Sequence, residues 1–225
     1  MGDLSLARAI QDFVFGFGTL FAIINPYGLA FVFLDRTIGL SRSERTLVAR
    51  KVAIFSFVVL VVSLYAGSII LGFFGISLPA LRIAGGLVVA VAGWGMLEQA
   101  EHPGVGATRS TADFATISQM AFFPLTVPLT TGPGTIAAAI ALSANREEAL
   151  RGIVFSSAIS LLVAAAVAVT IFSAYRHADT MARWMGPEGT RVVTRLSAFL
   201  LLCVGVEIML TGVSDALRPL LRPPA

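Results

Sequence analysis

Charged residues cluster in short segments of the chain, and long apolar stretches separate them. The stretches without Asp, Glu, Lys or Arg are 13–34, 52–81, 83–97, 114–145, 152–175 and 196–206. An α-helix needs about 20 apolar residues to cross the roughly 30 Å hydrocarbon core of a bilayer. The pattern therefore predicts an all-α polytopic membrane protein with six transmembrane helices, at about 13–34, 52–74, 78–97, 114–143, 152–175 and 192–213.

The composition supports this interpretation. Of the 225 residues, 56 % are hydrophobic and 13 % are charged, whereas soluble domains average roughly 25 % charged residues. A soluble fold of this size would leave a large apolar surface in water, so an ordinary soluble enzyme is excluded. We expect one transmembrane domain over residues 1–225. The single cysteine, Cys203, permits no intramolecular disulfide.

The basic residues predict an orientation. The longest polar connections are about 35–51, 98–113 and 176–191, and together with the flanking Arg195 they hold ten of the 16 Lys and Arg residues. Basic residues favour the cytoplasmic side of a membrane. Both termini are therefore expected outside the cytoplasm. The mixed charges before the first apolar stretch are typical of a retained span rather than a cleaved signal peptide.

The two halves of the chain resemble each other. Residues 82–97 align with 195–210, where Arg82 matches Arg195 and a Met-Leu pair ends both segments. Phe-Ser pairs at 55 and 155 follow the same order. Two halves of three spans each, 1–100 and 101–225, form an inverted repeat, as in many secondary transporters. The alternative is chance similarity between apolar helices.

Helix-breaking residues interrupt the first span of each half. The first contains Asn25-Pro26-Tyr27-Gly28, and the fourth contains three prolines and two glycines within 124–134. Proline lacks an N–H group and disfavours helix at the residue before it. An interrupted helix leaves backbone polar groups unpaired, and membranes tolerate this only inside protein or beside a wet cavity. Nearby amide and hydroxyl side chains that could pair with them are Asn25, Thr126, Thr130, Thr131 and Thr135.

Such breaks predict a binding site for a small solute. New helices should begin near Gly28 and Gly134, and their free N–H groups favour an anion such as a carboxylate. The carbonyls that end the preceding helices suit an ammonium group. The alternative is two proline kinks without a ligand. The candidate substrate-binding residues are Asn25, Pro26, Tyr27, Gly28, Thr130, Thr131, Gly132, Pro133, Gly134 and Thr135.

Three ionisable residues are further candidates. Glu207 is a carboxylate well inside a predicted span, where acids are costly and often functional, so it is a candidate proton carrier. It could instead lie near the membrane surface or pair with an arginine. Arg82 and Arg195 could hold a substrate carboxylate or helix carbonyls, or extend to the interface as long basic side chains do.

Other motifs predict structure rather than chemistry. Ser41-Arg42-Ser43-Glu44 matches a capping box and predicts a helix start. Gly85, Gly86, Gly93 and Gly95 favour close helix contact. No metal-ligand spacing, catalytic Ser/His set or nucleotide-binding loop is present, so we expect no enzyme activity, cofactor, metal or nucleic acid. The expected partners are a small-molecule substrate and membrane lipid, and a homo-oligomer is left open.

Three segments carry a family resemblance. Residues 25–28, the segment 78–86 (Leu-Pro-Ala-Leu-Arg-Ile-Ala-Gly-Gly) and the segment 123–134 resemble the MarC family in order and approximate spacing. The resemblance implies a six-span protein of the bacterial inner membrane and, for some members, transport of small neutral amino acids. Members commonly carry a further proline after the first break, where this chain has Phe31.

Two alternatives remain open at this stage. One is a passive channel or facilitator built on the same repeat. The other is a topology in which 13–34 and 114–143 are re-entrant hairpins, which leaves four true spans. Six spans place the connections 36–50 and 144–150 on opposite sides of the membrane, so cysteine accessibility would distinguish the topologies.

Overall fold

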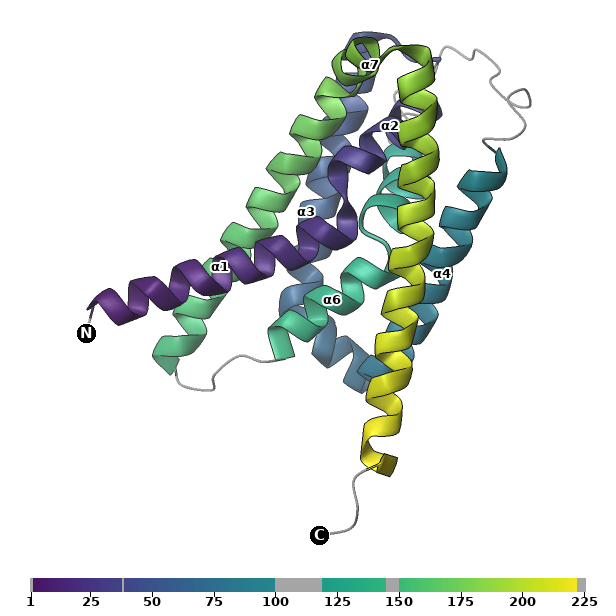
Figure 1. Cartoon of the computed structure of the whole chain (residues 1–225). Helices are drawn as coiled ribbons and strands as arrows, with labels where there is room; N and C mark the ends of the chain where they lie inside the picture. Colours follow the sequence, from purple (N-terminus) through teal and green to yellow (C-terminus); the bar gives the residue numbers. More distant parts are fainter. Residues whose placement is uncertain (1, 38, 100–118, 145–149, 222–225) are drawn as a thin grey trace.

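The computed structural model describes residues 2–37, 39–99, 119–144 and 150–221 (Figure 1). These ranges contain helices and no strand. The helices are α1 (Gly2–Ile24), α2 (Pro26–Arg36), α3 (Arg42–Phe73), α4 (Leu78–Gln99), η1 (Ala121–Thr130), α6 (Pro133–Ala144) and α7 (Leu150–Leu221). Residues 100–118 are not among those described. They include most of the predicted connection 98–113 and the predicted start of the fourth span, 114–118.

Five helical segments in these ranges are long and apolar enough to cross a membrane: Ala7–Arg36, Arg42–Phe73, Leu78–Glu98, Ser157–Gly186 and Glu188–Arg218. A sixth arises if η1 and α6, which meet at a bend of 62°, form one span. Polytopic all-helical architecture is thus confirmed, with five to six spans. The bend fits a broken span and a re-entrant loop equally well.

The outer surface of the bundle fits a lipid environment. Large apolar side chains point outward from α3, α4 and α7, for example Ile69 at 72 % exposure, Trp94 at 62 % and Val169 at 67 %. Several hydroxyl groups lie in the interior instead, including Thr126 and Thr130. Water would disfavour so much exposed apolar surface, whereas hydrocarbon solvates it.

Two local predictions about helix starts are confirmed, and one connection is corrected. α4 begins at Leu78, and α3 begins with the predicted capping box between Ser41 and Glu44. The predicted polar connection 176–191 is almost wholly helical, because α7 continues to a sharp turn at Gly186. Gly186 has a φ of 71°, which glycine adopts without strain. The charged residues of 176–191 therefore show where α7 leaves the apolar layer of the membrane. They do not show where the helix ends.

Glycines bring α4 and the second half of α7 into close antiparallel contact. A Cβ atom on Gly86 would lie 2.6 Å from the Gly205 carbonyl oxygen, and one on Gly93 would lie 2.9 Å from the Leu202 Cα. Later residues of α4 thus meet earlier residues of α7, as Figure 1 shows for the two adjacent helices. Close contact is confirmed for Gly86 and Gly93, whereas Gly95 faces open space.

Replacing Gly86 by leucine is expected to lower the free energy of unfolding by about 3 kcal/mol, because the new side chain meets backbone that cannot move aside. The matched control is Gly95→Leu on the same helix, where a Cβ has no neighbour within 4 Å. Reversible unfolding in mixed detergent micelles measures both. Equal stability of the two variants would contradict the observed helix contact.

Candidate functional site

The first break is a single residue between α1 and α2. Asn25 has φ 44° and ψ 61°, a left-handed conformation, and its side-chain oxygen accepts from the Gly28 N–H at 3.3 Å. The Asn25 N–H donates to the Phe21 carbonyl at 2.8 Å. Its carbonyl accepts from the Leu29 N–H at 3.0 Å. Asparagine suits both roles, since its short amide caps helices and tolerates this conformation.

Fewer backbone groups are free at this break than the sequence predicts. Of the first three residues of α2, Pro26 has no N–H and Asn25 caps the Gly28 N–H, which leaves the Tyr27 N–H. On the other side, the Ala22 carbonyl loses its usual i+4 donor, since that donor position is Pro26. The first break therefore offers one N–H, at Tyr27, and one carbonyl, at Ala22, and both residues are exposed.

The candidate residues of the first break lie in different environments. Pro26 and Gly28 are buried, and Asn25 is half-buried. Tyr27 is 46 % exposed, and its ring packs edge-on against Phe21 with centroids 6.2 Å apart. The structure therefore places Tyr27 on the outer surface, away from the buried residues beside it.

The second break is longer and more irregular. η1 contains extended backbone at Phe123 and Val127, and the peptide bonds before Pro124 and Pro128 are cis. Regular helix resumes only with α6 at Pro133. The predicted loss of regular helix over 124–134 is confirmed.

Threonine hydroxyls pair with the backbone that this irregularity releases. Thr126 donates to the Ala121 carbonyl at 2.6 Å, and Thr130 donates to the Leu125 carbonyl at 2.6 Å. Thr131 reaches the Thr126 carbonyl at 3.4 Å. All three are buried. The irregular backbone is thus held inside the protein, as the cost of unpaired groups in a membrane requires.

The start of α6 leaves two N–H groups available. Pro133 has none, and the Ile136 N–H donates to the Gly132 carbonyl at 3.0 Å. Within the described part of the chain, the N–H groups of Gly134 and Thr135 have no acceptor. Both residues are buried. The positive end of α6 can therefore accept an anionic group.

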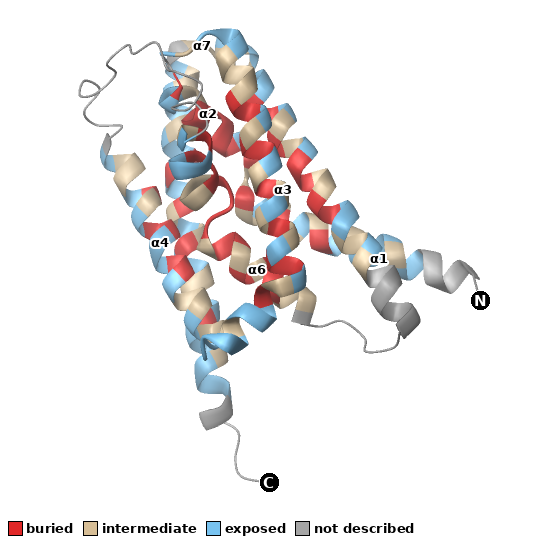
Figure 2. Cartoon of the chain, turned by 180° about the vertical axis from the view of Figure 1, so that it is seen from behind, coloured by how far each residue is buried: buried red, intermediate tan, exposed pale blue. Residues whose placement is uncertain are grey.

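Close packing fixes this helix start between α4 and the second half of α7. A Cβ on Gly85 would lie 2.8 Å from the Pro133 carbonyl carbon. A Cβ on Gly134 would lie 2.6 Å from Ile208 Cδ1 and 3.4 Å from Val89 Cγ2. Figure 2 shows the connection from η1 to α6 as buried ribbon in the middle of the bundle.

The two breaks lie next to each other in the fold. α1 packs against α6, and α2 packs against η1, so each helix before a break contacts the helix after the other break. This exchange brings α1 toward α6 and α2 toward η1, while Ala22 itself is exposed and Gly134 is buried. Segments about 110 residues apart in sequence thus form one region, as Figure 1 also shows.

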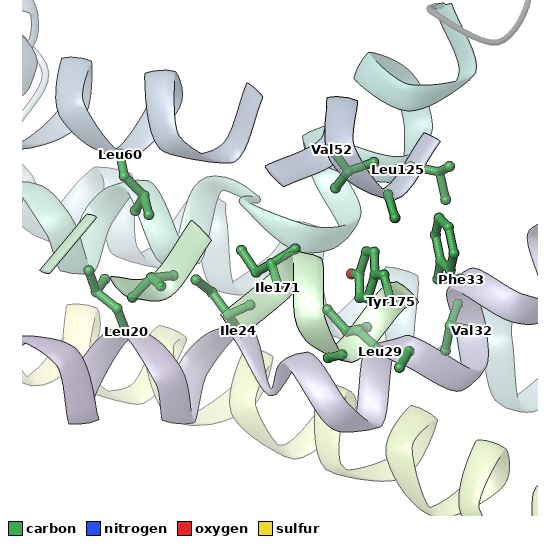
Figure 3. Close-up of a cluster of buried hydrophobic side chains, with 14 of the residues drawn as sticks. Leu20, Ile24, Leu29, Val32, Phe33, Val52, Leu60, Leu125, Ile171 and Tyr175 are labelled. Carbon is green, nitrogen blue, oxygen red and sulfur yellow. The ribbon is translucent and has the colours of Figure 1, made fainter. Parts of the chain in front are cut away.

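Tyr175 joins these segments and was not found from the sequence. Its hydroxyl lies 2.7 Å from Thr130 Oγ1, and its ring stacks on Phe33 of α2 with centroids 4.5 Å apart (Figure 3). Because Thr130 donates its own proton to Leu125, Tyr175 is the donor to Thr130. In the sequence, Tyr175 is the last residue of an apolar stretch, a position typical of aromatic residues at the membrane interface. The sequence therefore gives no sign that its side chain lies in the interior.

Ion pairs close the bundle at both ends. Arg45 of α3 pairs with Asp179 in the first half of α7, and it also donates to the Thr37 carbonyl at 3.1 Å. Arg82 of α4 pairs with Asp215 in the second half of α7. The structure thus joins Arg82 to a carboxylate of the protein itself and to neither break.

The other ionisable candidates lie on the outside. Glu207 is exposed on α7, one residue before the Ile208 that meets Gly134, and the described residues supply no ion-pair partner for it. Arg195 is also exposed on α7. No group of His, Cys, Asp and Glu that could hold a metal occurs in the described ranges.

A family model and several known proteins match most of the chain. The model of the MarC family integral membrane proteins matches residues 10–217. The chain is 32 % identical to the UPF0056 inner membrane protein MarC of Citrobacter koseri over 211 residues, 90 % of this chain and 94 % of the relative. It is 30 % identical to the protein of that name in Escherichia coli O1:K1 / APEC over 223 residues, 96 % of this chain and 98 % of the relative. No solved structure matches the chain.

Proposed function

Because this chain belongs to the MarC family of integral membrane proteins, we propose that it is a secondary transporter of small neutral amino acids or similar small zwitterionic solutes. The names of its relatives and its apolar helices indicate a multi-pass inner membrane protein. The observation that carries the proposal is the pair of adjacent helix breaks inside the bundle. Backbone of this kind in a membrane favours a binding region over a packing role.

The chemistry of the breaks supports a zwitterionic substrate. The N–H groups of Gly134 and Thr135 lie at the positive end of α6 and suit a carboxylate. The Ala22 carbonyl at the end of α1 suits an ammonium group. α1 and α6 pack together, so the helix that ends with the Ala22 carbonyl contacts the helix that carries Gly134 and Thr135. The buried Thr130 and Thr131 line the same connection.

Helix contacts support the inverted repeat. In such a repeat, α1 corresponds to η1, and α2 corresponds to α6. The repeat then pairs the contact between α1 and α6 with a contact between η1 and α2, and the structure contains both contacts. Likewise, α3 corresponds to the first half of α7. The repeat then pairs the contact between α3 and η1 with a contact between α7 and α1, and both contacts occur. We propose two antiparallel halves with both termini outside the cytoplasm, and no enzymatic step.

The ion pairs support alternating access. Arg45–Asp179 joins helices where α3 begins, and Arg82–Asp215 joins helices at the opposite end of the bundle (Figure 1). Opening one end requires one pair to separate while the other holds. Rigid movement of one half against the other around a central site is the usual motion of inverted repeats.

A panel of radiolabelled amino acids in proteoliposomes tests this function. Saturable uptake and counterflow of a small neutral amino acid such as glycine or alanine are expected. With Glu207 as proton carrier, a pH gradient increases uptake, and Glu207→Gln abolishes that increase while Glu188→Gln, also exposed on α7, retains it. Large unitary currents without counterflow would favour a channel. No uptake of any panel member would contradict the proposal.

A further inference from the structure

A polar cavity lies outside the region of the two breaks. It has a volume of about 580 Å³ and is open to the surroundings at the end of the bundle where α3 begins. Two helices line it, and all the lining side chains are polar or basic: Arg42, Ser43 and Thr46 from α3, and Arg176 and His177 from α7. Neither the proposed transport site nor the ion pairs include these residues.

The cavity carries positive charge that the protein does not neutralise. In the part of the chain that the structure describes, neither Arg42 nor Arg176 has a carboxylate within 4.0 Å. The Arg176 guanidinium lies 5.7 Å from the Phe172 ring centroid, which holds it without removing its charge.

The acids close to the cavity are already engaged. Glu44 accepts from the Ser41 N–H at 2.8 Å within the capping box, and Asp179 pairs with Arg45. His177 Nδ1 lies 2.7 Å from the Ser173 carbonyl, so Nε2 is the ring nitrogen left for a ligand. The Ser43 hydroxyl lies 3.1 Å from Ser41 Oγ, and the Thr46 hydroxyl donates to the Arg42 carbonyl at 2.9 Å. Two guanidinium groups thus remain for an anion.

The register of α3 against α7 gives the depth of the cavity in the membrane. Arg45 pairs with Asp179, and the Tyr65 hydroxyl donates to the Ser157 carbonyl at 2.5 Å, so the two helices are antiparallel. The charge-free stretch of α3 begins after Lys51. Thr46 therefore lies five residues beyond the apolar layer, about 8 Å at the rise of an α-helix.

Thr46 lies at the depth of the lipid headgroups, whereas the backbone of Arg42, nine residues before Lys51, lies about 14 Å beyond the apolar layer, so only its long side chain can reach them. The polar headgroup region extends roughly 5–8 Å beyond the hydrocarbon core on each side. Arg176 directly follows the charge-free stretch of α7, so the cavity begins at the edge of the core. A phosphate group of a lipid is held at this depth by its own acyl chains.

We propose that this cavity binds the phosphate of an anionic phospholipid such as phosphatidylglycerol. Arg42 and Arg176 contact the phosphate oxygens, because guanidinium groups bind phosphate through paired, charge-assisted hydrogen bonds. Basic pockets between transmembrane helices are known to take such headgroups. A bound lipid would link α3 and α7 next to Arg45–Asp179 and hold this end of the bundle closed.

Native mass spectrometry of the detergent-purified full chain tests the proposal. The probes are phosphatidylglycerol, phosphatidylcholine and inorganic phosphate, each added separately. The pocket variant is Arg42→Gln/Arg176→Gln. The matched control is Arg50→Gln/Arg183→Gln, which removes the same charge from exposed positions of the same two helices outside the cavity.

Phosphatidylglycerol is expected to bind at least tenfold more tightly than phosphatidylcholine. The pocket variant loses at least tenfold in affinity for phosphatidylglycerol, and the control stays within about twofold. Equal losses in both variants would overturn the proposal in favour of diffuse attraction to basic residues. Inorganic phosphate that binds as tightly as the lipid would overturn the lipid as the source. If the double variant does not fold, Arg176→Gln against Arg183→Gln gives the same comparison.

Discussion

The Gly132→Ala variant is expected to lose most of its folded population and all transport. A methyl group at this position would overlap the Pro128 carbonyl oxygen and lie 3.2 Å from its carbon. Both atoms belong to backbone that threonine hydroxyls hold in place, so no side chain can rotate to make room. Overpacking against rigid atoms costs about 3 kcal/mol, the upper end of the usual range and a large share of the stability of a small domain.

Gly134→Ala is the matched control, two residues further along. Its methyl group would meet the tip of Ile208 at 2.6 Å, and that flexible side chain can move. We expect a loss of about 1 kcal/mol, and a second substitution, Ile208→Val, should restore part of it. Reversible unfolding in mixed detergent micelles measures all three variants. If Gly132→Ala were as stable as Gly134→Ala, the geometry of the second break would be wrong.

Removing the Arg45 side chain is the second large effect expected. Its side chain is 12 % exposed, and its guanidinium pairs with Asp179 and donates to the carbonyls of Thr37 and Leu40 at 3.1 and 3.2 Å. In Arg45→Met, the partly buried Asp179 carboxylate and the carbonyls of Thr37 and Leu40 lose their guanidinium donors. Breaking such a pair costs about 3 kcal/mol, measured as the loss in the free energy of unfolding.

A double variant separates the charge pair from simple packing. Arg45→Met/Asp179→Asn should recover part of the loss, because no unpaired carboxylate remains. Arg50→Met, an exposed position on the same helix, should change stability by less than about 0.5 kcal/mol. A loss in Arg50→Met as large as that in Arg45→Met would show that the ion pair has no special role.

The parts of the fold that depend on neighbouring residues were predictable from the sequence. Pro26 and the prolines of 124–134 interrupt helices wherever they occur, because the missing N–H and the ring clash are local. The capping box at Ser41 is likewise a local pattern, and the structure confirms it. Apolar stretches indicated the membrane because their length is matched to the bilayer.

The partners of individual side chains were not predictable. Arg82 meets Asp215 across 133 positions of sequence, and Tyr175 meets Thr130 across 45. Such contacts depend on how the helices pack. Spans that are apolar on all sides also give no sign of which face points inward. This is why Glu207 could be placed in a span but not on the exposed face of α7.

The extent of each break also depends on tertiary structure. Both breaks were expected to free N–H groups, yet at the first one Pro26 has no N–H and the Asn25 amide caps that of Gly28. At the second break, the free N–H groups of Gly134 and Thr135 remain. The sequence predicts the position of a helix break. How many backbone groups the break leaves unpaired depends on the conformation of a single residue such as Asn25.

The most direct test of the central claim, that the two breaks bind the transported solute, is counterflow in proteoliposomes by the wild type and the Asn25→Gly variant. Glycine tolerates the left-handed conformation of this residue, so a loss of only a few tenths of a kcal/mol in stability is expected. The amide that caps Gly28 at the first break is removed. The account predicts saturable counterflow of a small neutral amino acid by the wild type and at least a tenfold loss in the folded variant. Equal counterflow by both proteins would contradict it.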